Sequence, residues 1–350
     1  MKKVVIGISA AILIFIGAFV ILFMIETTAV SRDKEIIEFE IKKGDTYLSL
    51  ASSLKESNLI KSELFYKIYI KLMNPKSVQA GIYNLSESMS VSDIIKKFGK
   101  GNNYNPSIVK FTIPEGKHLE NVAEIIANKT DHKKDELLEL WDSFDFIDEL
   151  IGKYWFITDD VKKKGIRHPL EGYFFPDTYE LLNKSIDGKT IAYKMLDKMD
   201  KVLSVYKKEI KNNEYSIHQL LSLASIVEHE AILDEDRSVI AGVFYNRLNI
   251  KMKLESCATI GYAIDEWKLT YSKKDLMVDS PYNTYLYAGI PIGPGNMPGA
   301  KSIEAVINPA KSDYLFFLAN VCDKENKKTY FSKTYAEHIE KKKLYLTCFN

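Results

Sequence analysis

The 350-residue sequence is poor in cysteine and lacks the paired ligands of a metal site. Its three cysteines, Cys257, Cys322 and Cys348, are odd in number and widely spaced, so they indicate neither a zinc site nor a disulfide framework. At least one thiol should be free or paired between molecules. The HExxH and paired-cysteine patterns are absent. Neighbours on a helix, such as Glu228 and His229, point about 100° apart and converge poorly on one ion. We therefore expect no metal ion and no cofactor.

An excess of charge of one sign is missing as well. The 48 basic and 47 acidic residues leave a net charge of +1, which provides no electrostatic basis for binding nucleic acid. The sequence also lacks a P-loop, a Rossmann fingerprint and the G-x-S-x-G elbow of serine hydrolases. Charged residues at 27% and aromatic residues at 12% indicate a folded protein and not a disordered tail.

One long hydrophobic run is present at the N-terminus. Residues 4–25 carry no charge, and at about 1.5 Å per residue they could cross a hydrocarbon core about 30 Å thick. A cleaved signal peptide has a shorter apolar region of about 7–15 residues. The run therefore predicts an uncleaved, single-pass transmembrane helix, with a cytoplasmic tip at 1–3 and a polar stalk at 26–35.

The predicted orientation places the rest of the chain outside the cell membrane. Lys2 and Lys3 face Arg32 and Lys34 across the run, so the positive-inside rule discriminates little between the two orientations. The outside is expected because a lone N-terminal anchor is the usual tether of an exported domain. The predicted localisation is the cell membrane, with everything after the stalk extracytoplasmic.

Residues 36–101 are predicted to form a small α/β unit. Residues 37–41 alternate apolar and polar side chains as a strand does, and a Lys43-Gly44-Asp45 turn follows. The other predicted elements are helices at 47–54 and 62–72, a strand at 80–85, and a helix at 91–98 that Ser90 caps together with Asp93. The Asn- and Gly-rich stretch 101–107 then predicts a domain boundary.

Residues 108–350 are predicted to form a larger, mixed α+β domain, so that the predicted fold class of the whole chain is α+β. Residues 133–165 are acidic and aromatic and predict a helical insertion. Residues 289–299 form the most turn-rich piece of the chain. The other predicted elements are a strand at 108–113, an extended segment at 172–179, and helices at 119–128, 187–211, 216–231, 234–249 and 302–307.

The helix predicted at 216–231 carries an acid beside its apolar stripe. At about 100° per residue, Glu228 projects between Ala224 and Leu221, inside the edge of that stripe. His218, Ser222, Ser225 and His229 are among the residues of the opposite face. Desolvation would raise the pKa of such a carboxyl, so that it could act as a general acid near neutral pH. The structural alternative is a boundary glutamate whose carboxylate reaches water or an arginine.

A glycosidase of the common two-carboxylate type would need a second acid about 5–9.5 Å from Glu228. Several acids are near in sequence or could be near in space, and spacing does not choose among them. A single-acid mechanism therefore stays open. The candidates are Glu230, Asp234, Glu235 and Asp236, followed by Glu171, Asp177 and Glu255.

Tyr and Asn side chains, which suit sugar rings and hydroxyls, occur in two short motifs after this helix. One is Tyr245-Asn246-Arg247 and the other is Tyr282-Asn283-Thr284-Tyr285. The structural alternative is that Tyr245 belongs to the core and Arg247 to a helix surface.

These motifs, taken in order, resemble the series found in the endolytic murein transglycosylase family (MltG, YceG-like). The Leu223–Glu230 run resembles the catalytic signature of that family, and residues 36–101 look like its LysM-like module. The resemblance covers nearly the whole chain, including the hydrophobic run. The matching segments are 113–116, 171–179, 223–230, 243–248, 254–259, 282–285 and 289–299.

The resemblance implies a membrane-anchored lyase that cuts the MurNAc–GlcNAc bond within nascent peptidoglycan strands, terminates their elongation, and meets cell-wall synthases. Residues 108–350 would be the catalytic domain. Glu228 would protonate the glycosidic oxygen and then accept the proton of the MurNAc 6-hydroxyl as a 1,6-anhydro ring closes. The implied substrate-binding residues are Asn246, Arg247, Glu255, Tyr282, Asn283 and Tyr285.

The segment 254–259 departs from the family pattern. This chain has Glu255-Ser256-Cys257-Ala258 where the family often has Gln-Ser/Thr-Asp-Pro. Glu255 therefore brings a charge, and a second carboxylate, to a place where the family has an amide. Cys257 lacks a matching base, which a cysteine nucleophile requires.

Two other functions are compatible with the residues. A two-carboxylate muramidase would use water and leave reducing ends. A non-catalytic, anchored scaffold would bind peptidoglycan without cutting it.

Overall fold

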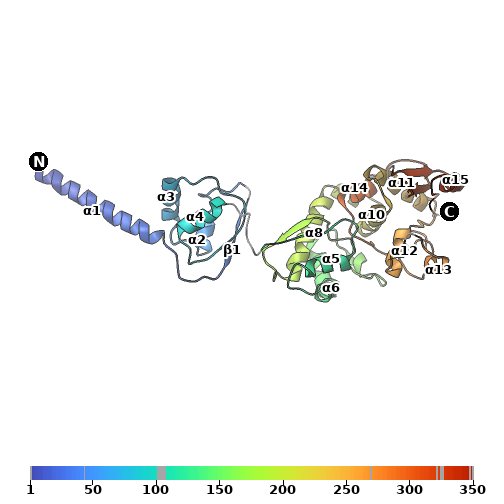
Figure 1. Ribbon diagram of the computed structural model, residues 1–350, viewed down its shortest axis with the longest axis horizontal. Coiled ribbons are helices and arrows are strands. Elements are labelled where there is room, and N and C mark those ends of the chain that lie inside the picture. The colour runs from blue at the N-terminus through green and yellow to red at the C-terminus, as the bar shows by residue number, and fades with distance from the viewer. Residues whose placement is uncertain are drawn as a thin grey trace. The chain divides into compact units, whose positions relative to one another are not determined.

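The computed structural model describes residues 2–42, 44–100, 108–268, 270–320, 322–323, 327–346 and 348. For residues 2–13 and 100 it describes the helical backbone only. The chain forms two compact units, Met1–Ile108 and Val109–Asn350 (Figure 1). The predicted boundary at 101–107 lies outside the described residues.

The first unit contains a two-stranded antiparallel sheet covered by helices. Strand β1 (Ile37–Ile41) pairs with β2 (Gly81–Leu85), with Phe39 opposite Tyr83. Between them lie α2 (Ala51–Glu56) and α3 (Glu63–Met73), and α4 (Val91–Lys100) follows. Phe39, Tyr83 and Phe98 pack ring against ring in its core.

The ends of two helices in this unit follow from local hydrogen bonds. Ser90 and Asp93 bond each other's backbone N–H groups at the start of α4, and this confirms the predicted cap. Helix α2 begins at Ala51 and not at residue 47. Residues 47–50 form turns, in which the Thr46 hydroxyl accepts a hydrogen bond from the Ser49 N–H at 3.2 Å.

Helix α1 (Lys2–Glu26) covers the predicted transmembrane run. In the described part of the chain, no helix is long and apolar enough to cross a bilayer. Two side chains of α1, Phe19 and Phe23, pack against Phe65 and Tyr69 of α3. The predicted transmembrane anchor at 4–25 and the single-pass cell-membrane localisation are therefore wrong.

The second unit is mainly helical and includes two small antiparallel sheets. Strand β3 (Val109–Thr112) pairs with β4 (Thr178–Leu181), and β5 (Phe316–Ala319) pairs with β6 (Thr329–Ser332). The mixed α+β composition agrees with the prediction. The helices before the centre of the unit are α5 (Leu119–Ala127), α6 (Lys134–Asp142), α7 (Phe144–Lys153), the 3-10 turn η1 (Asp159–Lys162), α8 (Gly188–Ser204) and α9 (Lys207–Lys211).

Helix α10 (Ile217–Glu230) lies inside the second unit and carries Glu228 in its last turn. Ser216 and Gln219 bond each other's backbone N–H groups at its start. It packs against α11 (Arg237–Asn249), α12 (Cys257–Ile264) and α14 (Ala300–Ile307) (Figure 1). The remaining elements are η2 (Asp234–Asp236), α13 (Lys273–Leu276) and α15 (Tyr335–Tyr345).

Two predicted helices differ from the observed ones. The helix predicted over 187–211 is divided into α8 and α9, because the Tyr206 N–H bonds the Leu203 carbonyl in a tighter turn. The helix predicted over 234–249 begins with η2, and α11 starts only at Arg237. Residues 133–165 hold α6, α7 and η1, and Trp141 and Phe146 from this stretch are buried in the core.

The cysteines form one disulfide bond, between Cys322 and Cys348. Cys257 is a free thiol, which confirms the prediction that at least one thiol stays unpaired or bonds between molecules. The Cys322–Cys348 bond was not predicted, because its partners are distant in sequence and meet only through the fold.

The close packing of α11 at Gly242 can be tested by substitution. A Cβ atom at Gly242 would lie 2.3 Å from the Ala310 carbonyl oxygen, and a backbone neighbour can move little. We expect Gly242→Ala to lower the free energy of unfolding by about 1–3 kcal/mol. Thermal or urea unfolding of the whole chain measures this loss.

Gly152 of α7 is the matched control, because a Cβ atom there would meet nothing within 4 Å. Gly152→Ala should leave the stability unchanged or raise it by up to about 1 kcal/mol, since it restricts only the unfolded chain. Equal effects of the two substitutions would contradict the proposed backbone contact.

Candidate active site

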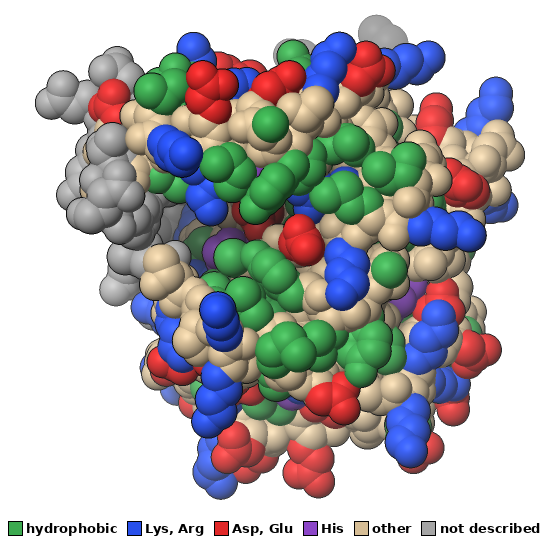
Figure 2. Space-filling view, turned by 90° about the vertical axis from the view of Figure 1, so that its right-hand side faces the viewer, with side chains coloured by type: hydrophobic (Ala, Val, Ile, Leu, Met, Phe, Trp, Pro, Cys, Tyr) green, Lys and Arg blue, Asp and Glu red, His purple; other side chains and the backbone are tan. Residues whose placement is uncertain are grey.

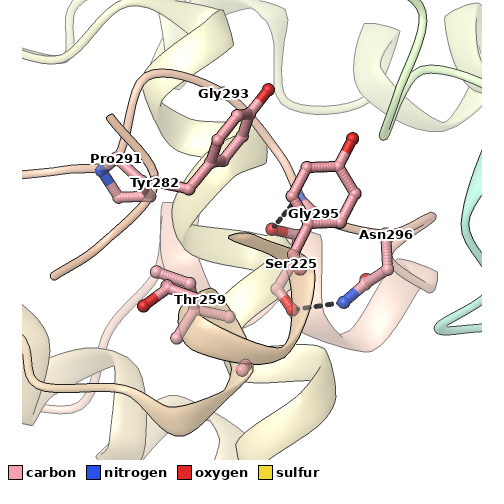
Figure 3. Close-up of a pocket in the computed structure, with 10 residues that line it drawn as sticks. Ser225, Thr259, Tyr282, Pro291, Gly293, Gly295 and Asn296 are labelled. Carbon is pink, nitrogen blue, oxygen red and sulfur yellow. Dashed lines mark hydrogen bonds between the residues drawn. The ribbon is translucent and has the colours of Figure 1, made fainter. Parts of the chain in front are cut away.

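Two buried polar side chains of α10, His218 and Ser225, face the glycine- and proline-rich loop at 289–299. His218 Nε2 donates to the Ile292 carbonyl at 2.8 Å, so His218 Nδ1 accepts from the Tyr173 hydroxyl, also at 2.8 Å. Ser225 Oγ accepts from the Gly295 N–H at 3.1 Å. The Asn296 amide donates to the Ser225 carbonyl at 2.9 Å, as Figure 3 shows. These side chains therefore hold the loop in place.

A small pocket remains between α10, α12 and this loop (Figure 3). Its volume is about 10 Å³, which is room for about one water molecule and not for a sugar ring. The pocket is lined by Ser225, Ile226, Ala258, Thr259, Tyr262, Tyr282, Pro291, Gly293, Gly295 and Asn296.

The loop ends at Gly299, which brings the start of α14 to Glu228. The Gly299 N–H donates to Glu228 Oε2 at 2.9 Å, and the Ser302 hydroxyl donates to the same oxygen at 2.8 Å. Gly299 is the N-cap residue of α14, so the carboxylate lies at the positive end of that helix. The Glu228 side chain is only 7% exposed.

Arg237, the first residue of α11, completes the surroundings of Glu228. Its Nη1 lies 3.2 Å from Glu228 Oε1, and the same nitrogen donates to Ser302 Oγ. Its Nε donates to Asp234 at 3.1 Å. Two hydrogen-bond donors and one guanidinium therefore hold the two carboxylate oxygens. The predicted apolar edge is not what surrounds Glu228; the structure shows the alternative, a glutamate that reaches an arginine.

A turn distant in sequence reaches the same place. The Gly116 N–H donates to the Met297 carbonyl, and the Met297 N–H donates to the Lys117 carbonyl, both at 2.8 Å. Gly116 adopts a φ of +74°, and a Cβ atom there would lie 3.9 Å from Glu228 Cγ. Its neighbour Glu115 is thereby placed beside the site. In the sequence, this Pro-Glu-Gly turn was matched only as part of the family pattern, and Glu115 was not among the predicted site residues.

The structure separates the other candidate acids. Asp234 pairs with Arg237 and Lys301 close to Glu228. Glu230 accepts a hydrogen bond from the Ser256 hydroxyl at 2.6 Å. Glu235 and Asp236 belong to η2. Asp177 pairs with Lys198 of α8. Glu171 is buried and accepts a hydrogen bond from the Leu119 N–H at the start of α5.

Three predicted substrate-binding residues have side chains that bond the backbone. Asn246 donates to the Ser312 and Tyr314 carbonyls, and Arg247 donates to the Leu254 and Leu315 carbonyls. Asn283 donates to the carbonyls of Leu276 and Val278 and is 1% exposed. These contacts occupy the side-chain donors and hold loops around the site.

The other three predicted substrate-binding residues, Tyr282, Tyr285 and Glu255, lie close to α12. Tyr282 is buried, and its hydroxyl accepts from the Arg167 N–H at 3.2 Å. The Tyr285 hydroxyl lies 3.2 Å from Cys257 Sγ. The Glu255 side chain is 46% exposed, with its carboxylate 3.9 Å from Arg247. Tyr285 and Glu255 are thus the members of the predicted set whose side chains are partly exposed and donate to no backbone carbonyl of the described residues.

A stack of aromatic rings begins at His229, the residue that follows Glu228 in the chain. The ring of His229 stacks on Trp267 with centroids 4.2 Å apart, and His118 stacks on Trp267 at 5.2 Å. Trp267 itself is 41% exposed. Figure 2 shows hydrophobic side chains gathered near the middle of one face of the protein, with charged side chains around them.

The described part of the chain holds no set of ligands for a metal ion. No three His, Cys, Asp or Glu side chains there gather closely enough to hold a metal ion.

Comparison with known proteins identifies the family of this site. The model of the YceG-like family matches residues 39–344. The chain belongs to the YceG-like family. The resemblance inferred from the motifs is thereby confirmed, and Glu228, Gly299 and Arg237 all lie within the matched region.

Curated and solved relatives agree with this membership. The endolytic murein transglycosylase of Bacillus subtilis (strain 168) is 37% identical over 318 residues, which cover 91% of this chain and 87% of that protein. The endolytic murein transglycosylase of Streptococcus pneumoniae (strain R6) is 34% identical over 89% of this chain, which spans 60% of that protein's length. The crystal structure of a yceG-like protein from Listeria monocytogenes superposes with a TM-score of 0.63 at 38% identity, covering 88% of this chain and 99% of that one.

Buried Glu171 makes the stability of this family member depend on pH. Its carboxyl accepts the Leu119 N–H at 3.0 and 3.1 Å and the Tyr262 hydroxyl at 3.1 Å. Burial raises the pKa of Glu171 from 4.5 to about 7. The folded state therefore binds this proton more tightly than the unfolded state. Its contribution to stability is full below about pH 4.5 and is lost as the pH rises through about 7.

We expect Glu171→Gln to remove this contribution. Between pH 4.5 and 7.5, the free energy of unfolding of the wild type should fall relative to that of the variant by a few kcal/mol. Urea unfolding at several pH values measures the difference. Glu124→Gln, which changes an exposed glutamate of α5, is the control and should follow the wild type. Parallel curves for the wild type and Glu171→Gln would contradict the assignment.

Proposed function

We propose that this chain is an endolytic murein transglycosylase, which cuts the MurNAc–GlcNAc bond within peptidoglycan strands and leaves a 1,6-anhydro-MurNAc end. The names of the curated relatives support the proposal. The structural observation that carries it is the position of Glu228, a nearly buried carboxylate held at both oxygens by Gly299, Ser302 and Arg237.

The geometry around Glu228 suits a group that exchanges protons with a bound sugar. The helix end, the hydroxyl and the guanidinium are preorganised, so the carboxylate needs no rearrangement to stabilise charge during the reaction. It is supported by α10, α11 and α14, whose packing restricts its position. Such rigidity keeps the reacting atoms in register, a requirement of acid–base catalysis.

The reaction needs no water and no covalent enzyme intermediate. In the simplest form of the reaction, protonated Glu228 donates its proton to the glycosidic oxygen as the C1–O bond breaks. The MurNAc 6-hydroxyl oxygen then bonds to C1, and the Glu228 carboxylate takes the hydroxyl proton. The sugar's own hydroxyl replaces the solvent nucleophile, so proximity lowers the barrier.

The glycan itself would contact the exposed groups near this carboxylate. We propose Tyr285 and Glu255 for polar contacts, and Trp267 as an aromatic surface for a sugar ring. Asn246, Arg247 and Asn283 would act indirectly, because their side chains hold the surrounding loops. Cutting inside strands would end their elongation, which makes cell-wall synthases the proposed protein partners.

The decisive test is the chemistry of the new chain ends. Wild-type protein should convert purified peptidoglycan strands into fragments with anhydro ends, which are one water lighter than reducing ends in mass spectrometry. Glu228→Gln should lower the rate by about 10²–10⁴-fold or more, because the amide cannot transfer protons. Thermal unfolding of the variant checks that the fold is retained.

Glu214→Gln is the matched control, since Glu214 is an exposed glutamate just before α10. It should cut strands at the wild-type rate. Fragments with reducing ends would show a muramidase instead, and binding without cutting by the wild type would show a scaffold. Either result would contradict the proposal.

A further inference from the structure

A second carboxyl group meets Glu228 at Gly299. The space at the Gly299 Cα where a side chain would begin is filled by Glu115. A Cβ atom there would lie 2.0 Å from Glu115 Oε1 and 2.2 Å from its Cδ. The N–H of the same residue bonds Glu228 Oε2 at 2.9 Å. With ordinary backbone geometry, the nearest oxygens of the two carboxyl groups are therefore no more than about 8 Å apart.

The two carboxyl groups have opposite surroundings. Glu228 accepts hydrogen bonds from Gly299 and Ser302 and pairs with Arg237. Glu115 belongs to an exposed turn, and no described residue donates a hydrogen bond to its carboxyl oxygens. Hydrogen bonds to a carboxylate favour its ionised form, whereas a nearby like charge favours protonation of the group that lacks them.

The charges that face Glu115 come from three elements besides α10. Partial burial of its carboxyl and the negative charge of Glu228 raise the pKa of Glu115, and Asp234 of η2 adds to this effect. Arg237 of α11 and Lys301 of α14 oppose it. The raised pKa of Glu115 suits it to hold a proton, and the donors around Glu228 suit that group to be the base.

We infer that Glu115 is the second carboxyl of this active site and holds the proton that the departing glycosidic oxygen receives, while Glu228 is the carboxylate that accepts the proton of the 6-hydroxyl. The inference rests on the proposed function and divides between two residues the roles that Glu228 would otherwise perform alone. The glycine at 299 is required because any side chain there would displace Glu115 from Glu228.

The protons and bonds balance over one cycle. Glu115 gives its proton to the glycosidic oxygen, the C1–O bond breaks, and the GlcNAc part leaves with a hydroxyl group. The O6 atom of MurNAc bonds to C1 and loses its proton to Glu228. Glu228 then releases this proton to solvent, Glu115 takes one up from solvent, and both groups are restored. No water is consumed.

The experiment compares Glu115→Gln, Glu115→Asp and Glu124→Gln in digests of purified strands followed by mass spectrometry over a range of pH. Glu115→Gln should lower the rate about 10²-fold or more. The wild-type rate should fall as the pH rises through the raised pKa of Glu115, and the residual rate of Glu115→Gln should lack that fall. Glu115→Asp should keep the fall at reduced rate. Glu124→Gln should match the wild type.

A second variant moves Glu115 without removing its charge. Gly299→Ala should lower the rate in the same way as Glu115→Gln, because its methyl group would occupy the position of the Glu115 carboxyl. Thermal unfolding of each variant separates this effect from loss of the fold. Glu115→Gln should unfold at the wild-type temperature, since its carboxyl accepts no hydrogen bond from a described residue.

Glu115→Gln with the wild-type rate and pH profile would overturn the inference and leave the proposed function intact. Loss of activity in Glu115→Gln with an unchanged pH profile would also overturn it, because a merely structural role would lower the rate without removing a titration. Wild-type digests without anhydro ends would instead refute the proposed function, so the two failures are distinguishable.

Discussion

The hydrogen bond from the Gly299 backbone to Glu228 is the contact on which the arrangement of the candidate site depends. It joins the last turn of α10 to the first turn of α14. The residues before Gly299 can reach it only because the loop is held along the polar face of α10 by His218 and Ser225. Buried polar side chains would be costly without partners, and here His218 and Ser225 bond backbone groups of the loop while the Ser222 hydroxyl bonds the His218 carbonyl.

This arrangement explains why the site combines rigidity with charge. Arg237, Ser302 and the N-terminus of α14 surround a carboxylate that is largely removed from water, where electrostatic interactions are stronger than in solvent. Breaking the set by losing one donor would leave a buried charge without a partner. Glu115, in an exposed turn and without such donors, has the complementary environment. The pair thus resembles other acid–base sites in which two carboxyls differ by surroundings and not by type.

Local patterns accounted for the elements that short-range forces determine. Ser216 and Gln219 cap α10, and Ser90 and Asp93 cap α4, because capping bonds join residues three apart in sequence. Local patterns failed where a distant segment changes the environment. The loop that bonds the polar side chains of α10 was not foreseen because it is about 70 residues away in sequence. The hydrophobic run at 4–25 suggested a membrane span, whereas no helix in the described part of the chain is long and apolar enough for one, and Phe19 and Phe23 of this run pack on α3.

The helical position of Glu228, the mixed α+β composition and the membership in the YceG-like family could be read from the residues, because periodicity, caps and ordered motifs are properties of the chain. The groups that surround that carboxylate could be found only from the packed fold. It brought Glu115, Arg237 and Gly299 together and turned the donors of Asn246, Arg247 and Asn283 toward backbone carbonyls. The physical reason is that hydrogen bonds and charge pairs depend on distances in space, and those distances exist only after the loops have packed.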